Sequence, residues 1–258
     1  MSIDALRVTL ARDGVFNTRD LGGLPTVDGR VVAPGRVVRG DALQRVKGAA
    51  DGLRRFGLVR VLDLRDERER DEDGVFGVDG IDVEHHPVID PTFAWYDLGE
   101  LELAQLLGQR YRDILGAFGP RLAGALTSIA EVVGPDGRGG AVAYHCAVGK
   151  DRTGLVTALV LSLLGVERDA IVADYARSAR ATAVQVQWLW AFGLPGGGAS
   201  DEDLALGVWS ARPETMRATL EWIDAEHGGI GAYLAAQGLD PQVGEALRAG
   251  LLIPADGR

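Results

Sequence analysis

Three short apolar runs along the chain have the pattern of buried strands. They are VRVLDLR at 59–65, IDVEHHPVI at 81–89 and AVAYH at 141–145, and the first ends in charged residues. Runs of β-branched residues and leucine with this length are typical of strands in a mostly parallel sheet. Helical patterns lie between and after the three runs. The alternation predicts an α/β fold in which helices flank a central, mostly parallel sheet.

The remaining segments extend this pattern. Turn signals and β-branched pairs up to about Arg39 predict small strands and hairpins, and residues 48–58 predict a short helix. Residues 91–133 contain enough amphipathic sequence for two or three helices, more than a minimal crossover needs. Beyond Val166 the pattern is almost entirely helical, with a glycine-rich break at 193–201. There is no internal repeat, so we expect a single domain over residues 1–258.

Composition and charge restrict the classes of partner. A chain of 258 residues that is 47% hydrophobic is long enough for one sizeable core. The 27 basic and 37 acidic side chains give a net charge of -10, which would repel nucleic acid but still permits a basic pocket for a small anion. The most apolar stretch, 155–166, is too short to cross a bilayer and predicts a buried helix. We therefore expect neither nucleic-acid binding nor integral membrane association.

The chain contains a single cysteine, Cys146. No intrachain disulfide can form, and a reduced thiol suits the cytosol. The first residues, MSIDALRVTLARDG, carry charges and lack the apolar run of a signal peptide, which favours a cytoplasmic location. Secretion by a route without a signal peptide and the oligomeric state are left open by the sequence.

The lone cysteine lies in YHCAVGKDRTG at 144–154. An ATP-binding P-loop is excluded, because Tyr144 stands where that motif needs glycine and Asp151 where it needs serine or threonine. A buried structural cysteine is the default interpretation for an isolated residue of this type. That interpretation does not explain the residues on either side of Cys146.

A phosphate-binding loop explains the neighbours as well. The strand at 141–145 runs through a short loop into a helical pattern, so backbone N–H groups and the first helical turn can converge on an anion. Cys146 at the base of that loop would be a thiolate nucleophile. Arg152 would hold two phosphate oxygens with its planar fork, and Gly149 would let the backbone turn.

The segment HCAVGKDRTG resembles the H-C-x5-R-[ST] signature loop of the Cys-dependent protein tyrosine phosphatase superfamily. The flanking segments FNTRDLGGLPTVDGRVVAPGRVVRGDAL, VLDLRDERE and DYARSARA are similar to atypical bacterial members, and the resemblance runs from about Val15 to GAYLAAQGLD. It implies a phosphomonoesterase that hydrolyses phosphotyrosine through a phosphocysteine, needs no cofactor, and acts on a phosphorylated protein. Phosphoserine, phosphothreonine and phosphoinositide substrates remain open.

The resemblance also implies roles for the loop residues. Cys146 would be the nucleophile, Arg152 the phosphate clamp, and Thr153 the hydroxyl that stabilises the thiolate when it leaves. His145 would lie behind the loop and help to keep Cys146 ionised. Backbone N–H groups would line the bowl at Ala147, Val148, Gly149, Lys150 and Asp151.

Several polar residues keep two interpretations each. Lys150 resembles loop lysines of phosphoinositide phosphatases, or it faces solvent. Asp151 would protonate the leaving oxygen, or it would orient Arg152 through an ion pair. Asp63 and Asp90, at the ends of predicted strands, are alternative general acids, and Asp63 has a structural alternative as a support of the loop.

Two further motifs are also ambiguous. Arg19 and Asp20 resemble a motif that packs near the site, or they form a structural ion pair. His85 and His86 predict no metal site, because neighbours on a strand point to opposite faces and no further ligands complete a set.

The helices after Pro91 resemble a helical lid at about 91–118, with an apolar face of Leu101, Leu103, Leu106 and Leu107. Packing into the core is the alternative. The rival function is a catalytically silent phosphate- or phosphoinositide-binding module, against which the joint presence of Cys146, Arg152 and Thr153 argues.

Overall fold

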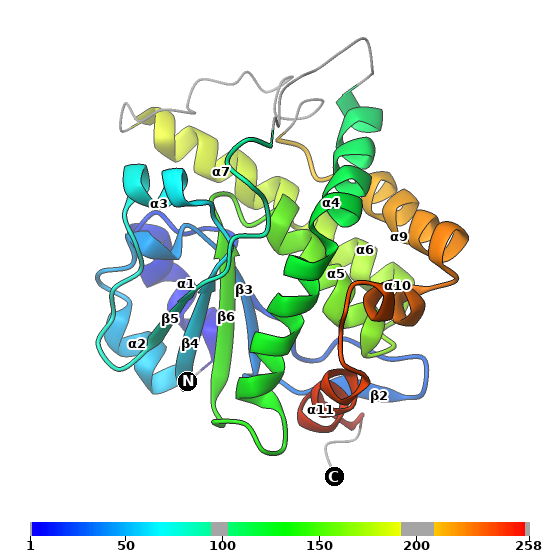
Figure 1. Cartoon of the computed structure of the whole chain (residues 1–258). Coiled ribbons are helices and arrows are strands. Elements are labelled where there is room, and N and C mark those ends of the chain that lie inside the picture. Colours follow the sequence, from blue (N-terminus) through cyan, green and yellow to red (C-terminus); the bar gives the residue numbers. More distant parts are fainter. Residues whose placement is uncertain (1, 94–102, 192–208, 256–258) are drawn as a thin grey trace.

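The structure is a computed structural model that describes residues 2–93, 103–191 and 209–255, with side chains omitted at 103–106. A five-stranded sheet lies at its centre, in the order β1-β3-β6-β4-β5 (Figure 1). The strands are β1 (Arg19–Asp20), β3 (Val37–Asp41), β6 (Ala141–Cys146), β4 (Leu58–Asp63) and β5 (Asp82–His85). Only β1 runs antiparallel to its neighbour. The predicted mostly parallel sheet is confirmed.

Helices cover both faces of this sheet (Figure 1). On one face lie α1 (Ile3–Arg12) and α2 (Ala50–Phe56), and on the other lie α4 (Leu103–Val133), α5 (Asp151–Leu163), α6 (Arg168–Ala176), α9 (Pro213–His227), α10 (Ile230–Ala236) and α11 (Pro241–Leu251). The remaining elements are η1 (Leu43–Arg45), α3 (Glu67–Asp73), α7 (Ser178–Ala191) and the small sheet of β2 (Arg30–Val32) with β7 (Leu252–Pro254). The described chain thus forms the α/β layers that the sequence predicts.

The central strand β6 shows how the sequence creates two cores. Successive side chains of a strand point to opposite faces, so Val142, Tyr144 and Cys146 join the core under α4 and α5. Ala141 and Ala143 join the smaller core under α1 and α2. Because both faces are covered, every residue of β6 is buried. The strand ends at Cys146, and α5 begins five residues later at Asp151.

Some predicted elements differ from the observed ones. The run at 81–89 forms a strand only at 82–85, although the N–H of His86 and of Val88 still donate to Asp63 and Leu64 carbonyls. The chain therefore follows β4 without regular pairing. Helix α1 was not predicted; Ser2 caps it, and Ile3, Leu6 and Leu10 are its buried face.

Of the two or three helices expected over 91–133, the described chain shows two helical segments, which follow one another in α4. Helix α4 is kinked at Phe118 (φ -122°, ψ 18°), two residues before Pro120, which removes a backbone donor. The predicted lid at 91–118 falls partly on residues 94–102, outside the described residues, as does Leu101; the side chains of Leu103 and Leu106 are not described either. Leu107 and the following apolar residues to Leu115 pack into the core. A lid therefore stays a prediction.

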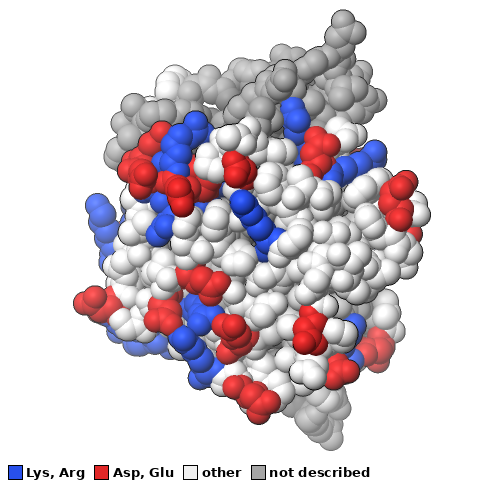
Figure 2. All heavy atoms as spheres, viewed as in Figure 1, with Lys and Arg blue, Asp and Glu red and all other residues white. Residues whose placement is uncertain are grey.

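Charged side chains of both signs mix over the face in Figure 2, with a gathering where Figure 1 places α3. Helix α3 has the sequence ERERDED, which accounts for that gathering. Among the residues that the structure describes, no helix combines the length and apolar character of a membrane span.

Candidate active site

Cys146 lies at the carboxyl end of the central strand. In the parallel register it stands beside Asp41 of β3, while His145 stands beside Gly40 on one side and Asp63 on the other. The cysteine is 2% exposed. Thr153, in the first turn of α5, donates its hydroxyl to Cys146 Sγ at 3.2 Å. The predicted hydrogen bond between this hydroxyl and the sulfur is therefore present in the structure.

Side chains from α7, from β3 and from the segment before β1 hold the loop after Cys146 by its carbonyl groups. The hydrogen bonds are Gln185 Nε2 to Ala147 O (3.1 Å), Asn17 Nδ2 to Val148 O (3.1 Å) and to Gly149 O (3.0 Å), and Arg39 Nη2 to Gly149 O (2.8 Å). No cis peptide bond occurs in the described chain, and across a trans peptide the next N–H points opposite to the carbonyl. With their carbonyls held on the outside, these peptides direct the N–H groups of Val148, Gly149 and Lys150 inward. The loop can therefore offer an anion a bowl of donors.

A buried ion-pair network stands behind these donors. Asp174 of α6 receives hydrogen bonds from Arg19 Nε and Arg39 Nη1, both at 2.6 Å. Arg19 Nη1 also donates to Asn17 Oδ1 at 2.5 Å, which fixes the orientation of the Asn17 amide. Burial opposes the charge of Asp174, but Arg39 and Arg19 outweigh it and lower the Asp174 pKa to about 2. The predicted role of Arg19 near the site thus has a physical basis.

Asp41 and Gly149 fix the two sides of the loop base. Asp41 is fully buried and accepts the N–H groups of Phe16 (3.0 Å) and Asn17 (2.7 Å), and its burial raises its pKa to about 6. Gly149 has φ +69°, and a Cβ there would lie 2.6 Å from the Gly40 carbonyl oxygen. Only glycine fits both the conformation and the space.

Arg152 is held by a residue that no sequence motif singled out. Its Nη1 and Nη2 donate to the two carboxylate oxygens of Glu69 at 2.5 and 2.7 Å. Glu69 lies in the first turn of α3, where it also forms a capping box with Asp66. Burial disfavours the Arg152 cation, yet the Glu69 hydrogen bonds more than compensate and raise the Arg152 pKa. The D-x-x-E pattern after a predicted strand was the available signal, but it indicates a helix start and says nothing of Arg152.

Lys150 and Asp151 form a buried polar group with two tyrosines. Lys150 is 1% exposed; its Nζ lies 3.2 Å from Asp151 Oδ1 and donates to the Ser210 carbonyl at 3.1 Å. The solvent-facing interpretation of Lys150 is therefore wrong. Asp151 Oδ1 also accepts the Tyr111 hydroxyl at 2.7 Å, and Tyr111 in turn bonds the Tyr175 hydroxyl. One predicted role of Asp151 was to orient Arg152 through an ion pair. In the structure, Glu69 forms an ion pair with Arg152.

Asp63 lies behind the loop in another buried cluster. It accepts hydrogen bonds from the Arg65 backbone N–H, Nε and Nη2 at 2.8–3.1 Å, and it lies 3.8 Å from His145 Nε2. Burial would raise the pKa of Asp63, but Arg65 and His145 outweigh it and lower the pKa. A carboxylate held in this way is a poor proton donor. The geometry favours its structural interpretation.

His145 is fully buried, and desolvation lowers its pKa to about 4. The imidazole is therefore neutral at pH 7, so any help that it gives to an ionised Cys146 comes from position rather than from positive charge. Its Nδ1 lies 3.3 Å from the Cys146 carbonyl oxygen.

The other predicted acids make local contacts. Asp90 bonds the N–H and hydroxyl of Thr92 and lies 3.8 Å from Arg121, with no described contact to the loop. Asp20 accepts the N–H groups of Gly22 (2.9 Å) and Gly35 (2.6 Å), which orders a turn. The structure therefore does not bring Asp90 and Asp20 to Cys146.

The adjacent histidines are engaged by backbone groups. His85 Nε2 bonds the Arg65 carbonyl at 2.9 Å and His86 Nε2 the Arg121 carbonyl at 2.7 Å. Within residues 2–93, 103–191 and 209–255, no group of three or more His, Cys, Asp and Glu side chains is arranged to hold a metal ion.

Comparisons with known proteins identify a family for the chain. The tyrosine phosphatase family matches residues 10–253. The chain is 31% identical to the triple specificity protein phosphatase PtpB of Mycobacterium tuberculosis, covering 93% of this chain and 97% of that protein. It is 30% identical to a protein of Cupriavidus necator named as a tyrosine-protein phosphatase, covering 88% and 83%. A crystal structure of P. aeruginosa TpbA in complex with pTyr covers 82% of this chain and 91% of its own at 14% identity, but its TM-score of 0.34 is too low to carry an argument.

Proposed function

The chain belongs to the tyrosine phosphatase family, and from this premise we propose that it hydrolyses phosphotyrosine through a phosphocysteine intermediate on Cys146. The observation that carries the proposal is the hydrogen bond from Thr153 to Cys146 Sγ at the base of a loop in which side chains hold the carbonyls of Ala147, Val148 and Gly149. A sulfur nucleophile, a bowl of N–H donors and a fixed guanidinium meet there.

In the first step, Cys146 Sγ attacks the phosphorus atom, and the bond between phosphorus and the tyrosine oxygen breaks. The departing phenolate oxygen needs a proton, for which Asp151 is the proposed donor. The loop N–H groups and Arg152 bind the three non-bridging oxygens, whose charge they stabilise most strongly in the transition state.

In the second step, water attacks the phosphocysteine and the bond between sulfur and phosphorus breaks. Inorganic phosphate leaves, and the proton lost by the water passes to the carboxylate that acted as the acid. The Thr153 hydroxyl donates to the sulfur as its negative charge returns. No metal or cofactor enters either step.

The substrate range is proposed to include phosphoserine, phosphothreonine or phosphoinositides besides phosphotyrosine. The name of the Mycobacterium tuberculosis relative describes three specificities, which supports testing all three classes. The resemblance of Lys150 to loop lysines of phosphoinositide phosphatases supports testing that class, although Asp151, 3.2 Å away, balances the charge of Lys150 in the structure. We place the activity in the cytoplasm, where the single thiol stays reduced.

The test is phosphate release from a phosphotyrosine peptide, a phosphoserine peptide and a set of phosphoinositides, measured side by side. Cys146→Ser protein is the blank, and Thr153→Ser is a variant that keeps the hydroxyl. We expect turnover of the phosphotyrosine peptide by wild-type protein, none by Cys146→Ser, and phosphate on the Cys146 peptide after rapid quenching.

Wild-type protein that binds these ligands but releases no phosphate would instead identify a silent binding module. Turnover that survives Cys146→Ser would reject the phosphocysteine route.

A further inference from the structure

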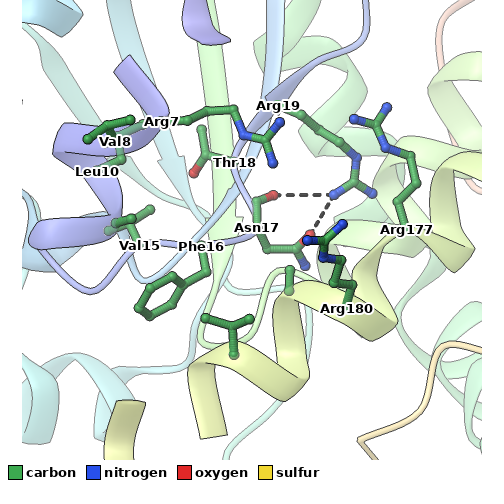
Figure 3. A pocket seen from close by; sticks show the side chains of 13 residues that line it. Arg7, Val8, Leu10, Val15, Phe16, Asn17, Thr18, Arg19, Arg177 and Arg180 are labelled. Carbon is green, nitrogen blue, oxygen red and sulfur yellow. Dashed lines mark hydrogen bonds between the residues drawn. The ribbon is translucent and has the colours of Figure 1, made fainter. Parts of the chain in front are cut away.

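A second cavity lies away from the cysteine, between α1, residues 15–19 and the start of α7 (Figure 3). Its volume is about 730 Å³, within the range of roughly 300–1,000 Å³ that small-molecule sites occupy. Neither Cys146 nor Arg152 lines it. It is therefore separate from the phosphate bowl.

One side of this cavity is strongly basic. Arg7, Arg19, Arg177 and Arg180 line it, and none of its described lining residues is acidic. Figure 3 shows the Arg177 and Arg180 side chains close to Arg19, with Arg7 reaching toward the same space from α1. Burial lowers the pKa of Arg19 to about 10, and the charges of Arg39 and, to a smaller extent, Arg177 act in the same direction.

These charges are only partly balanced. Asp174 pairs with Arg19 but also serves Arg39, and Arg7 has a single exposed partner, Asp4, at 3.7 Å. Arg177 and Arg180 form no ion pair within the part of the chain that the structure describes. Like charges so gathered repel one another, and in a chain of net charge -10 their gathering is not a general property of the surface.

The other side of the cavity is apolar. Val8, Leu10 and Val15 lie together opposite Arg19, Arg177 and Arg180 in Figure 3. Val8 is 65% exposed and Val184, on α7, is 41% exposed, so both offer apolar surface at the edge of the cavity. An exposed apolar rim next to a basic wall fits a ligand with two chemically different ends.

We propose that this cavity binds an anionic amphiphile, a molecule in which a phosphate or carboxylate head adjoins an apolar chain. The head would pair with Arg177 and Arg180, whose planar guanidinium groups can hold two oxygens of one anion. The apolar part would cover Val8 and Val184 and remove them from water.

The site shares residues with the support of the catalytic loop. Asn17 lines the cavity and donates to the carbonyls of Val148 and Gly149, and Arg19 orients Asn17. An occupant therefore lies against the outer side of the residues that hold the loop. Arg177 and Arg180 take no part in the hydrogen bonds described for that loop, so they are the residues to substitute.

The probe is dihexanoyl phosphatidylglycerol at concentrations at which it is monomeric, with decanoate as a second anionic probe. The first is a phosphodiester, which a phosphomonoesterase does not consume. Binding is measured by titration calorimetry on the full chain with vanadate present to occupy the catalytic loop. Dihexanoyl phosphatidylcholine tests the need for net negative charge, and inorganic phosphate tests the head alone.

We expect at least one anionic probe to bind wild-type protein, and to bind the Arg177→Ala/Arg180→Ala variant at least about tenfold more weakly. The matched control is Arg55→Ala/Arg248→Ala, which removes the same charge from two exposed positions outside the cavity. Its affinity should equal that of wild type.

Vesicles of dioleoyl phosphatidylglycerol distinguish the source of the ligand. Vesicle binding that depends on Arg177 and Arg180 indicates a membrane lipid. If the monomeric probe binds but the vesicles do not, the ligand is a soluble amphiphile.

The proposal is overturned if neither anionic probe binds, if the zwitterionic lipid binds as tightly, or if both double variants lose affinity equally. Phosphotyrosine turnover by the Arg177→Ala/Arg180→Ala variant without ligand should remain near the wild-type rate, which confirms that the variant is folded.

Discussion

The carboxylate of Glu69 accepts hydrogen bonds from both terminal nitrogens of the Arg152 guanidinium, at 2.5 and 2.7 Å. The contact joins the first turn of α3 to the first turn of α5 and fixes the plane of the Arg152 guanidinium, the proposed phosphate clamp. Positioning of this kind removes the cost of ordering a long side chain during the reaction. The fixed clamp leads to the first prediction.

Glu69→Gln should lower kcat/KM for phosphotyrosine peptides by about tenfold or more, because a charge-assisted hydrogen bond contributes roughly 1.5–3 kcal/mol. Glutamine keeps an oxygen that can accept the Asp66 N–H, so the helix start is preserved. The measurement is steady-state kinetics. Glu67→Gln, exposed on the same turn, is the control and should behave as wild type. Equal losses of kcat/KM in both variants would mean that the overall negative charge of α3 acts on the reaction, rather than the contact between Glu69 and Arg152.

Thr153 gives a prediction about one step of the reaction. Thr153→Ala removes the hydroxyl that donates to Cys146 Sγ at 3.2 Å, so hydrolysis of the phosphocysteine should slow by about tenfold or more while its formation changes less. The phosphoenzyme should then accumulate, visible as a burst of phenol release in stopped-flow measurements. Thr153→Ser keeps the donor and should show no larger burst than wild type. A Thr153→Ala protein that loses the burst altogether would assign the hydroxyl to the first step.

The local part of the site was predictable from the sequence. Strand β6, the loop and the start of α5 are consecutive in the chain, and the apolar run, the glycine and the spacing from Cys146 to Arg152 specify them together. Parallel pairing also placed Asp63 beside the end of this strand. Features that depend on neighbouring residues and on the edge of a parallel sheet can be deduced from one sequence.

The partners of the loop could not be deduced in this way. Glu69 lies 83 residues from Arg152, and Asn17 lies 131 residues from Val148. Which polar side chains meet at such separations depends on how α3 and the segment before β1 pack, and periodicity carries no such information.

Gly149 offers a test of close packing under the loop. Gly149→Ala would force a Cβ to within 2.6 Å of the Gly40 carbonyl oxygen at φ +69°, so both thermal stability and phosphate binding should fall. Gly139→Ala is the matched control, since φ is +73° there and no atom lies within 4 Å of the added Cβ. The control should lose only the cost of the backbone conformation, about 1 kcal/mol. Equal losses of Tm in both variants would show that the backbone angle alone requires glycine.

His145 predicts a pH dependence of stability. Its pKa falls from 6.5 to about 4 on folding because it is buried, so the unfolded state takes up a proton that the folded state refuses. The contribution of His145 to the free energy of unfolding is fully present above pH 6.5. It falls by about 3 kcal/mol as the pH is lowered toward 4. The difference in unfolding free energy between wild type and His145→Asn, from urea titrations, should shrink by this amount over that range.

The difference between the two proteins is needed because Asp41 acts in the opposite direction. Burial raises its pKa from 3.8 to about 6, so its contribution is present below pH 3.8 and is lost as the pH rises through 6. The two effects partly cancel in the wild-type curve. A difference that stays constant from pH 4 to 6.5 would show that His145 is already protonated in the folded protein, next to Asp63.

Whether Asp151 is the general acid can be tested by varying the acidity of the leaving phenol. If its carboxyl protonates the departing oxygen, Asp151→Asn should slow hydrolysis of phosphotyrosine by about 10²–10⁴-fold, and slow an aryl phosphate with an acidic phenol much less, since that phenolate leaves unprotonated. Tyr111→Phe, which removes the hydroxyl bonded to Asp151 but leaves the carboxyl, is the companion variant and should show a smaller loss with the same dependence on the leaving group. Rates for a series of substituted aryl phosphates decide the matter. Losses of the same size across the series would mean that Asp151 serves only to hold Lys150, 3.2 Å away, and the acid would then have to be sought elsewhere.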